Sequence, residues 1–377
     1  MSAQSERDEL IAAIVESPED DAPRLVYADW LLAAGDRYGE LIVASLEYAQ
    51  RPEDLALKRR VAGLISAHKS AVLGGLPVSK PAFHRGFVDA AQINAKAFLE
   101  LGPTLFERLP LLRELIIWLE RGRAPAKLCS SPAFADLSRL RLRFGHELRL
   151  PKLANNPSVS GLELLELTGC AVTLEDCEAL AASPYLGSLR TLELGSDAIG
   201  TQGVRALGKA AFAPRLRRLR LYEARLGPGG TRALAPFTSL QRLELDHDEL
   251  DLPALEWLAE LAPTLRELSV RGDRLGPGAV AALAPLKLRA LDLEGVRIGD
   301  AGIAELAKLD LSSLEVLVLS ANDLTRKAAT RLAGLPMPKL RRLALRHNEM
   351  GRCARVFAAK LTHTRVELDE KVLPAGR

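Results

Sequence analysis

The stretch RLRRLRLYEARL, residues 215–226, carries five arginines in twelve positions. It is either a basic segment for nucleic acid or a strand in which leucine and arginine alternate. Residues two apart on a strand point to the same side. A strand here therefore turns Leu219 and Leu221 into a core and leaves Arg218 and Arg220 on the outward face.

The same leucine pattern recurs along the chain. The form LxxLxLxxxxLG, with Ile, Val or Met at some leucine positions, occurs in LRTLELGSDAIG (189–200), LRRLRLYEARLG (216–227), LRELSVRGDRLG (265–276), LRALDLEGVRIG (288–299) and LRRLALRHNEMG (340–351). The shorter frame LxxLxL also fits segments that begin at Leu112, Leu137, Leu162, Leu240 and Leu314. Successive starts lie 23 to 27 residues apart, which is the period of a leucine-rich repeat.

The second half of each unit has helical spacing, as in GTQGVRALGKA and GDAGIAELAKL. Expected N-caps of these helices are Thr173, Asp251, Asp300 and Thr325. The ninth repeat position holds Asn, Asp or Cys in most units, and such side chains bond turn backbone locally. Ala224 and Val296 cannot do so, and the sequence therefore predicts a broken turn ladder in those two repeats.

These ten matches resemble leucine-rich repeats of the ribonuclease-inhibitor or GALA type. The resemblance covers most of residues 83–370. It implies an α/β leucine-rich-repeat solenoid with a parallel sheet on the concave face and helices on the convex face. A small all-helical amino-terminal domain is expected to precede it.

That amino-terminal domain shows helical spacing in ELIAAIVE and PRLVYADWLLAAG, with further helices expected at 38–50 and about 52–68. The segments DDAPRLVYADWL and GDRYGELI resemble a bacterial repeat-companion domain, although Arg37 stands where that pattern has proline. The expected organisation is a repeat-companion domain at 1–80, a capping unit at 81–111, the solenoid at 112–370 and a tail at 371–377. Residues 83–93 are expected to form the capping unit's first strand.

Composition narrows the function classes. The charged amino terminus lacks a signal-peptide core, and no apolar run is long enough to span a membrane. The scattered cysteines Cys129, Cys170, Cys177 and Cys353 indicate reduced thiols, and a cytoplasmic location is expected. The six histidines have no metal-ligand spacing, and no phosphate-binding or nucleophile motif is present. We therefore expect no enzyme activity, metal or cofactor.

The outward strand positions alternate in charge through the centre of the array: Arg220 is expected between Glu193 and Glu244, Arg242 before Glu267, and Arg271 between Asp246 and Glu294. This alternation argues against nucleic acid binding. Two patches lack this cancellation in the sequence. One joins Trp118 to Arg139, Arg141 and Arg143, a composition typical of protein interfaces, unless Trp118 packs under the amino-terminal domain. The other is distal and holds Arg342, Arg346 and His347, unless these form a solvated end repeat. Tyr222, Arg242 and His247 form a third candidate in the centre.

Charge is divided unevenly along the chain. Residues 1–54 hold 13 acids and 4 bases, a net of −9, so the remainder carries +12 of the total +3. The acidic head either docks on its own solenoid or has separate partners.

The sequence favours a scaffold that binds a protein partner through Trp118, Arg139, Arg141, Arg143, Tyr222, Arg242 and His247. The alternatives are an enzyme inhibitor similar to ribonuclease inhibitor and, less favoured, a nucleic-acid-binding protein.

Overall fold

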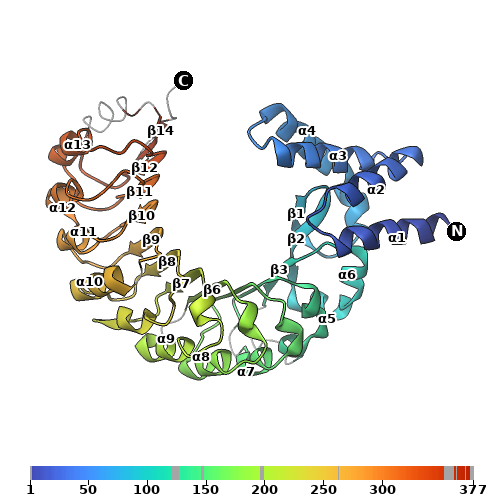
Figure 1. Cartoon of the computed structure of the whole chain (residues 1–377), viewed down its shortest axis with the longest axis horizontal. Coiled ribbons are helices and arrows are strands. Elements are labelled where there is room, and N and C mark those ends of the chain that lie inside the picture. Colours follow the sequence, from blue (N-terminus) through green and yellow to red (C-terminus); the bar gives the residue numbers. More distant parts are fainter. Residues whose placement is uncertain are drawn as a thin grey trace. The chain divides into compact units, whose positions relative to one another are not determined.

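A computed structural model describes residues 2–119, 127–145, 148–195, 199–261, 263–351, 361, 363–369 and 371–373. The chain forms two compact units. The first comprises residues 1–149 together with 156–162, and the second comprises residues 150–155 together with 163–377. The ribbon is shown in Figure 1, and we describe each unit by itself. No helix among the described residues is both long and apolar enough to cross a bilayer.

Four helices open the first unit: α1 (Ala3–Glu16), α2 (Ala22–Ala33), α3 (Tyr38–Gln50) and α4 (Leu55–Leu73). Side chains begin two of them, because Ser2 accepts the N–H of Ser5 and Asp54 accepts the N–H groups of Ala56 and Leu57. Their shared core contains Ile14, Tyr27, Ala28, Leu31 and Ile42. The expected helix at 38–50 is confirmed, whereas the fourth begins and ends a few residues later than expected.

The sheet of the first unit has strands β1 (Ser79–His84), β2 (Phe87–Asn94), β3 (Glu114–Trp118) and β4 (Arg139–Arg143). Between them lie helices α5 (Ala95–Leu101) and α6 (Thr104–Arg108) and the 3-10 helices η1 (Leu128–Ser130) and η2 (Pro132–Asp136), and a further 3-10 helix of this unit, η3 (Pro157–Val159), follows β4. The expected single strand at 83–93 is wrong, since β1 and β2 form an antiparallel hairpin there. The turn is made by Arg85 and Gly86, which both have positive φ.

The second unit repeats one strand per leucine unit. Its strands are β5 (Leu164–Thr168), β6 (Thr191–Gly195), β7 (Arg218–Tyr222), β8 (Arg242–Asp246), β9 (Glu267–Arg271), β10 (Ala290–Asp292), β11 (Val316–Val318), β12 (Arg342–Ala344), β13 (Arg365–Leu368) and β14 (Lys371–Leu373). Neighbours from β5 to β13 pair in parallel, and β14 returns antiparallel to β13 within the segment expected to be a tail.

Parallel register stacks the leucines in columns. The first leucine of each LxL pairs in one row that runs through Leu165, Leu192, Leu219, Leu243, Leu268, Leu291, Leu317 and Leu343. Each of these side chains is at most 2% exposed. Arg218 and Arg220 are half-buried on the opposite face, between buried leucines, which confirms the predicted alternation. This row of buried leucines is the core of the second unit.

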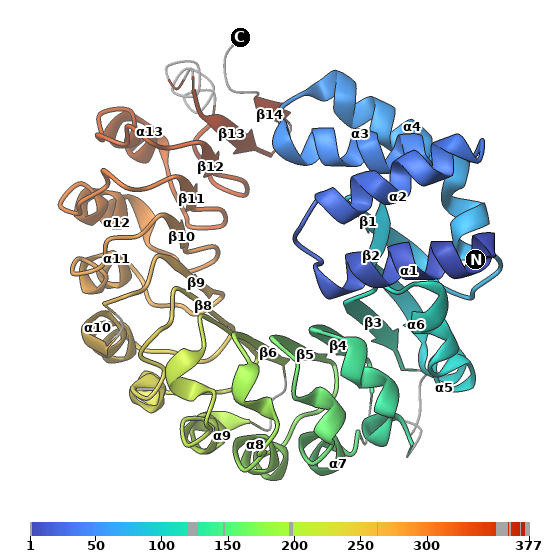
Figure 2. The same ribbon diagram turned by 45° about the vertical axis from the view of Figure 1, so that its right-hand side comes forward.

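The return segments lie on the leucine side of the sheet, as the second view also shows (Figure 2). They are α7 (Leu150–Ala154), α8 (Leu174–Ala181), α9 (Gly200–Leu207), α10 (Leu252–Leu261), α11 (Gly278–Ala282), α12 (Gly299–Leu306), α13 (Arg326–Leu332) and the 3-10 helices η4 (Leu186–Ser188), η5 (Ala213–Arg215) and η6 (Gly230–Leu234). The α/β leucine-rich-repeat solenoid is thus confirmed. The opposite face of the sheet carries no helix among the described residues, and we call it the open face.

The predicted caps are largely confirmed. Thr173 forms a capping box with Asp176, Thr325 accepts the N–H of Lys327, and Asp251 accepts the N–H of Ala254 at the start of α10. Asp300 is an exception, because it lies inside α12 and accepts the N–H of Thr325 in the next repeat at 2.9 Å. It ties two neighbouring repeats together and caps no helix of its own.

Ala224 and Val296 provide no side-chain hydrogen bond, as predicted, but the turn backbone stays bonded to the adjacent repeat at both positions, because their carbonyls accept the N–H groups of Gly200 and Gly276 at 2.8 and 3.0 Å. Asp248 from the following repeat reaches back to accept the N–H of Ala224 at 2.6 Å. Asp248 is fully buried, and its other oxygen, Oδ2, has no hydrogen-bond partner among the described residues. Burial raises the pKa of Asp248 to about 7, despite the hydrogen bond from Ala224. A carboxyl group thus fills a place where the fold favours a neutral side chain.

Asn322 occupies the same repeat position three repeats later and shows what a neutral side chain does there. Its amide donates to the carbonyls of Leu293 and Ser320 at 2.7 and 3.1 Å, and its oxygen accepts the N–H of Ile298 at 3.2 Å. An amide can donate where an ionised carboxylate can only accept. Asparagine therefore satisfies this turn at any pH, whereas aspartate must be protonated to donate.

Replacing Asp248 with asparagine should stabilise the protein at alkaline pH. The folded pKa of Asp248 lies above its unfolded value, so its contribution to stability is fully present below about pH 4 and lost as pH rises through about 7. We expect Asp248→Asn to raise the free energy of unfolding by about 1–3 kcal/mol at pH 8 and to have little effect at pH 4, as measured by urea denaturation. Asp300→Asn is the control and should give no gain at pH 8, because the pKa of Asp300 is lowered by its hydrogen bonds from Thr325 despite partial burial. Equal responses of the two variants would contradict this account.

Truncating a leucine of the stacked row should destabilise the second unit. Leu219 is fully buried, and Leu219→Ala leaves a cavity that costs about 2–5 kcal/mol. The measurement is the denaturation midpoint followed by circular dichroism. Leu25→Ala is the control, since Leu25 is 43% exposed on α2 and its loss should change stability by less than about 0.5 kcal/mol.

Candidate functional site: the open face of the second unit

The open face carries charged side chains in pairs that cross from strand to strand. Glu193 on β6 and Glu244 on β8 flank the arginines of β7. Arg218 lies 3.3 Å from Glu193 and 3.0 Å from Glu244, and Arg220 lies 4.0 and 3.2 Å from the same two carboxylates. The sequence prediction that Arg220 sits between Glu193 and Glu244 is confirmed.

Glu244 is the centre of this cluster. Its carboxylate also accepts a hydrogen bond from Nε of Arg242 at 2.6 Å, so three arginines surround it. Burial alone opposes ionisation, but Arg218, Arg242 and Arg220 together hold the pKa of Glu244 below its usual value. Arg242 also reaches Glu267 at 3.1 Å, as the sequence predicted.

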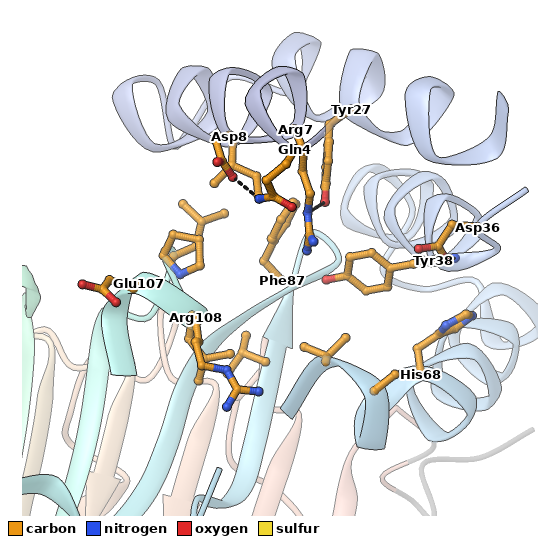
Figure 3. A pocket seen from close by; sticks show the side chains of 17 residues that line it. Gln4, Arg7, Asp8, Tyr27, Asp36, Tyr38, His68, Phe87, Glu107 and Arg108 are labelled. Atoms are coloured by element: carbon orange, nitrogen blue, oxygen red, sulfur yellow. Dashed lines mark hydrogen bonds between the residues drawn. The ribbon is translucent and has the colours of Figure 1, made fainter. Parts of the chain in front are cut away.

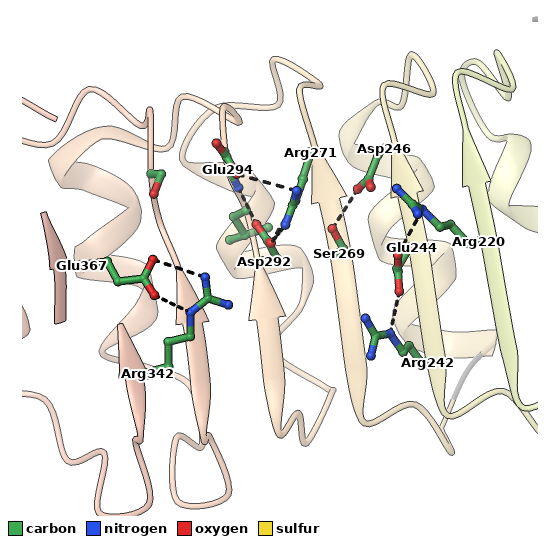
Figure 4. A network of polar contacts seen from close by, with 12 residues as sticks. Arg220, Arg242, Glu244, Asp246, Ser269, Arg271, Asp292, Glu294, Arg342 and Glu367 are labelled. Atoms are coloured by element: carbon green, nitrogen blue, oxygen red, sulfur yellow. Dashed lines mark hydrogen bonds and ion pairs between the residues drawn. The ribbon is translucent and has the colours of Figure 1, made fainter. Parts of the chain in front are cut away.

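A second cluster lies on β8 to β10 (Figure 4). Arg271 forms an ion pair with Asp292 and lies 3.8 Å from Glu294. Asp246, the other expected partner of Arg271, instead accepts a hydrogen bond from Ser269 at 2.8 Å. Burial raises the pKa of Asp246, while the Ser269 hydrogen bond opposes that rise.

The prediction that Arg342, Arg346 and His347 form a distal basic patch without neighbouring acids is wrong. Glu367 on β13 pairs with Arg342 at 3.0 Å and with Arg346 at 3.4 Å. His347 lies 3.5 Å from Asp369. The leucine frame ends with the repeat that begins at Leu340. No strand was therefore expected at the position of β13, and Glu367 was not recognised as a partner of these arginines. The stretch RVEL at 365–368, with one inward valine and one inward leucine, was the available signal.

Acids and bases on this face differ in depth. The principal carboxylate partners are deeply set, with side chains 6–14% exposed: Glu193, Glu244, Asp292 and Glu367. The arginines above them are 30–47% exposed: Arg218, Arg220, Arg242, Arg271 and Arg342. Glu267 and Glu294 are exceptions, with side chains 38% and 41% exposed, so solvent meets these two carboxylates together with the guanidinium groups.

The paired arginines surround a depression in the sheet. A hollow of about 440 Å³ spans the open face from β7 to β12. Ser269, Ala290, Val316 and Val318 line it together with Arg242, Arg271 and Arg342. We call it the Ala290 hollow.

Tyr222 and His247 lie beside each other at the ends of β7 and β8. Their rings contact edge to face with centroids 5.8 Å apart, and Tyr222 is 39% exposed. His247 has φ of 62° and turns its ring over Gly272, where an added Cβ would lie 2.1 Å from the imidazole. The structure thus brings the predicted contacts Tyr222 and His247 together, whereas Arg242 lies at the opposite, amino-terminal end of β8.

The other predicted contacts lie on the sheet of the first unit. Trp118 stacks on Phe144 at 5.4 Å, donates to Gln92 at 3.1 Å and has the guanidinium of Arg143 5.8 Å from its ring. Phe144 is 50% exposed. Trp118, Phe144 and Arg143 therefore form one aromatic and cationic cluster.

The charges of Arg139 and Arg141 are neutralised by nearby carboxylates, so the prediction of an unpaired basic patch is wrong for these two residues. Arg139 pairs with Glu114 at 2.7 Å and with Asp89, on β2, at 2.6 Å. Arg141 pairs with the other oxygen of Glu114 at 2.7 Å. The Glu114 pairs connect β3 to β4. The Asp89 pair reaches β2, which lies outside the leucine frame.

A cavity of about 470 Å³ lies within the first unit, between α1, α4, β2 and α6 (Figure 3). Its polar groups hold the unit together. Arg7 donates to Tyr27 Oη at 3.2 Å, Tyr38 Oη donates to the carbonyl of Gly86 at 2.6 Å, and Arg108 donates to the carbonyl of Gly74 at 3.0 Å. Both signs of charge mix along the wall, and the lining does not define one ligand chemistry.

The part of the chain that the structure describes contains no group of side chains arranged as a metal site and no exposed cysteine thiol. No cluster of three or more His, Cys, Asp or Glu side chains there is suited to a metal ion. Cys129, Cys170 and Cys177 are buried, and Cys170 donates to the carbonyl of Thr168. His146 and Cys353 lie outside the described residues.

Comparison with known proteins supports the architecture alone. No family model matches the chain, and no curated protein sequence matches it. Among solved structures, a chain of the Rad7 and Elc1 complex from yeast is 17% identical, with a TM-score of 0.55; the match covers 99% of this chain and 96% of that one. An internalin from Listeria monocytogenes is 20% identical, with a TM-score of 0.42, over 71% of this chain and 69% of that one. At this identity the yeast match indicates a shared fold.

Neutralising Glu244 should destabilise the open face. Glu244→Gln leaves three neighbouring arginines without their shared counter-charge, and we expect a loss of about 1–3 kcal/mol at pH 7. Because the folded pKa of Glu244 is lowered, its contribution is present above about pH 4.3 and is lost as pH falls through the folded value. The two proteins should therefore converge in stability in acid, as measured by urea denaturation at pH 7 and pH 3.

Glu267→Gln is the matched control for this measurement. Glu267 also pairs with Arg242, but its side chain is 38% exposed, and an exposed pair contributes at most about 1 kcal/mol. Equal losses in the two variants would show that the arginine cluster does not depend on Glu244.

Proposed function

We propose that the chain is a non-enzymatic scaffold that binds a protein partner on the open face of its leucine-rich-repeat sheet. The observation that carries this proposal is a broad sheet face that no helix of the second unit covers among its described residues, on which half-exposed arginines surround a hollow and Tyr222 is exposed beside His247. Tyrosine and arginine are enriched among the residues that dominate binding energy at protein interfaces. The yeast protein of similar fold was crystallised in a complex with another protein, which is consistent with this use of the fold.

Each unit contributes its own contacts in this proposal. In the second unit they are Tyr222, Arg242 and His247. In the first unit they are Trp118, Arg139, Arg141 and Arg143. Trp118 and Tyr222 serve as anchors because each presents an aromatic ring beside cationic or imidazole groups. Arg139 and Arg141 are held in fixed positions by Glu114, so they present ordered guanidinium groups.

Nucleic acid is less well suited to this face. A duplex or single strand binds through a run of phosphates and requires several unopposed cations. The Ala290 hollow is lined by five arginines and four acids, and two of these arginines, Arg218 and Arg342, also pair with Glu193 and Glu367. A row of phosphates would meet carboxylates on several of these strands, whereas a protein can place its few charges selectively.

Removing the aromatic anchor should weaken partner binding without unfolding the chain. A partner is first captured from host extract, and its contact is mapped by crosslinking from the full-length protein. We expect crosslinks on the open face, and we expect Tyr222→Ala and His247→Ala each to weaken binding of the purified partner at least tenfold in titration calorimetry. Leu174→Ala is the control, because Leu174 has similar exposure, 38%, but lies on α8, on the helical side of the sheet.

The control also defines failure. If Leu174→Ala weakens binding as much as Tyr222→Ala, or if crosslinks map to the helical side alone, the open face is not the binding site. Circular dichroism of each variant establishes that a change in affinity does not come from loss of fold.

A further inference from the structure

We infer that the Ala290 hollow receives a short acidic peptide segment that carries one aliphatic anchoring side chain between its carboxylates. This inference rests on the proposed function and specifies the partner's chemistry at one place on the open face. It follows from three features of the described residues: a step in side-chain size, the placement of arginines around it, and the depth of the carboxylates.

The step in size produces the hollow. On β10 and β11 the outward residues Ala290, Val316 and Val318 are small, and Ser269 on β9 adjoins them. Long side chains stand on either side, because Arg242 lies on β8 and Arg342 on β12. The floor is therefore mostly aliphatic and lower than its surroundings by the length of an arginine side chain. An aliphatic side chain placed on it would bury apolar surface from both partners.

The arginines stand at the two ends of one row. Register pairs Arg242 with Glu267, Glu267 with Ala290, Ala290 with Val316, and Val316 with Arg342. Four strand spacings of about 4.8 Å separate Arg242 from Arg342, or roughly 19 Å. An extended peptide rises about 3.3 Å per residue, so about six residues span that distance. The geometry selects a segment with an acid near each end and an aliphatic residue in its middle.

Depth decides the sign of the ligand's charge. Two of the carboxylates that line the hollow, those of Glu244 and Asp292, are 11% and 14% exposed, and that of Glu267 is 38% exposed, whereas Arg242 and Arg342 at the two ends of the row are 45% and 47% exposed. An approaching group meets guanidinium first. Carboxylates accept hydrogen bonds from arginine in two parallel contacts, so an acidic segment is favoured over a basic one.

The test begins with unbiased selection. Random twelve-residue peptides displayed on phage are selected on the full-length protein, and the recovered sequences are compared with the starting library. We expect enrichment of peptides in which two acids lie about four to six residues apart with Leu, Ile or Val between them. Enrichment of basic peptides, or no enrichment at all, would overturn the inference.

The best recovered peptide is then labelled with fluorescein, and its binding is measured by anisotropy against matched variants. Ala290→Trp fills the floor, and Val316→Glu places a negative charge on it; each should weaken binding at least tenfold. Thr168→Trp introduces the same large ring on the same face but on β5, outside the hollow, and should leave binding within twofold. Unchanged binding in both floor variants would place the peptide elsewhere and overturn the inference.

Two further outcomes separate the possible failures. If a single-stranded oligonucleotide displaces the peptide and binds more tightly at 150 mM salt, the face recognises phosphate and the peptide assignment is wrong. If the peptide selection fails but a captured partner still crosslinks to the open face and depends on Tyr222, only the inference fails. If no partner crosslinks to that face, the proposed function fails as well.

Discussion

The structure depends on parallel register between leucines that recur about every 25 residues. Leu192, Leu219 and Leu243 lie opposite one another on consecutive strands and are fully buried. Slipping one strand by a single residue would exchange its inward leucines for charged side chains. The register is thereby fixed wherever the leucine row continues, and every outward side chain acquires fixed neighbours on the strands before and after it.

Fixed neighbours make the electrostatics of the open face cooperative. Arg218, Arg220 and Arg242 share Glu244 because two adjacent strands, β7 and β8, bring their guanidinium groups within 3.2 Å of one carboxylate. Partial burial strengthens such pairs relative to isolated surface pairs. The same arrangement holds the arginines in defined positions, so a partner would not have to order these long side chains on binding. The stability of this face, and the partner recognition that we propose for it, therefore rest on one set of ion pairs.

Much of this arrangement could be predicted from the sequence. The strand positions, the inward leucines and the location of Arg220 between Glu193 and Glu244 follow from periods of two and about 25. Glu114 lies in register with Arg139 inside the leucine frame and could have been read in the same way, whereas Asp89, the other partner of Arg139, lies on a strand outside that frame. Glu367 was missed for a related reason, since valine replaces the first leucine of its strand. Side-chain depth, which separates guanidinium from carboxylate on the open face, has no signature in a linear pattern.

The turn ladder changes its chemistry along the stack. Asp248 and Asp273 occupy it in the middle repeats, and each leaves one buried carboxylate oxygen without a hydrogen bond to the described residues. Asn322 and Asn348 occupy it further on, and their amides donate to the carbonyls of Leu293 and Leu319. In a solenoid each repeat is stabilised chiefly by its two neighbours. At alkaline pH the least stable contacts between repeats therefore lie in the middle of the array. Heating at alkaline pH would unfold the central repeats first and leave a folded segment on either side, whereas a uniform array unfolds from its ends.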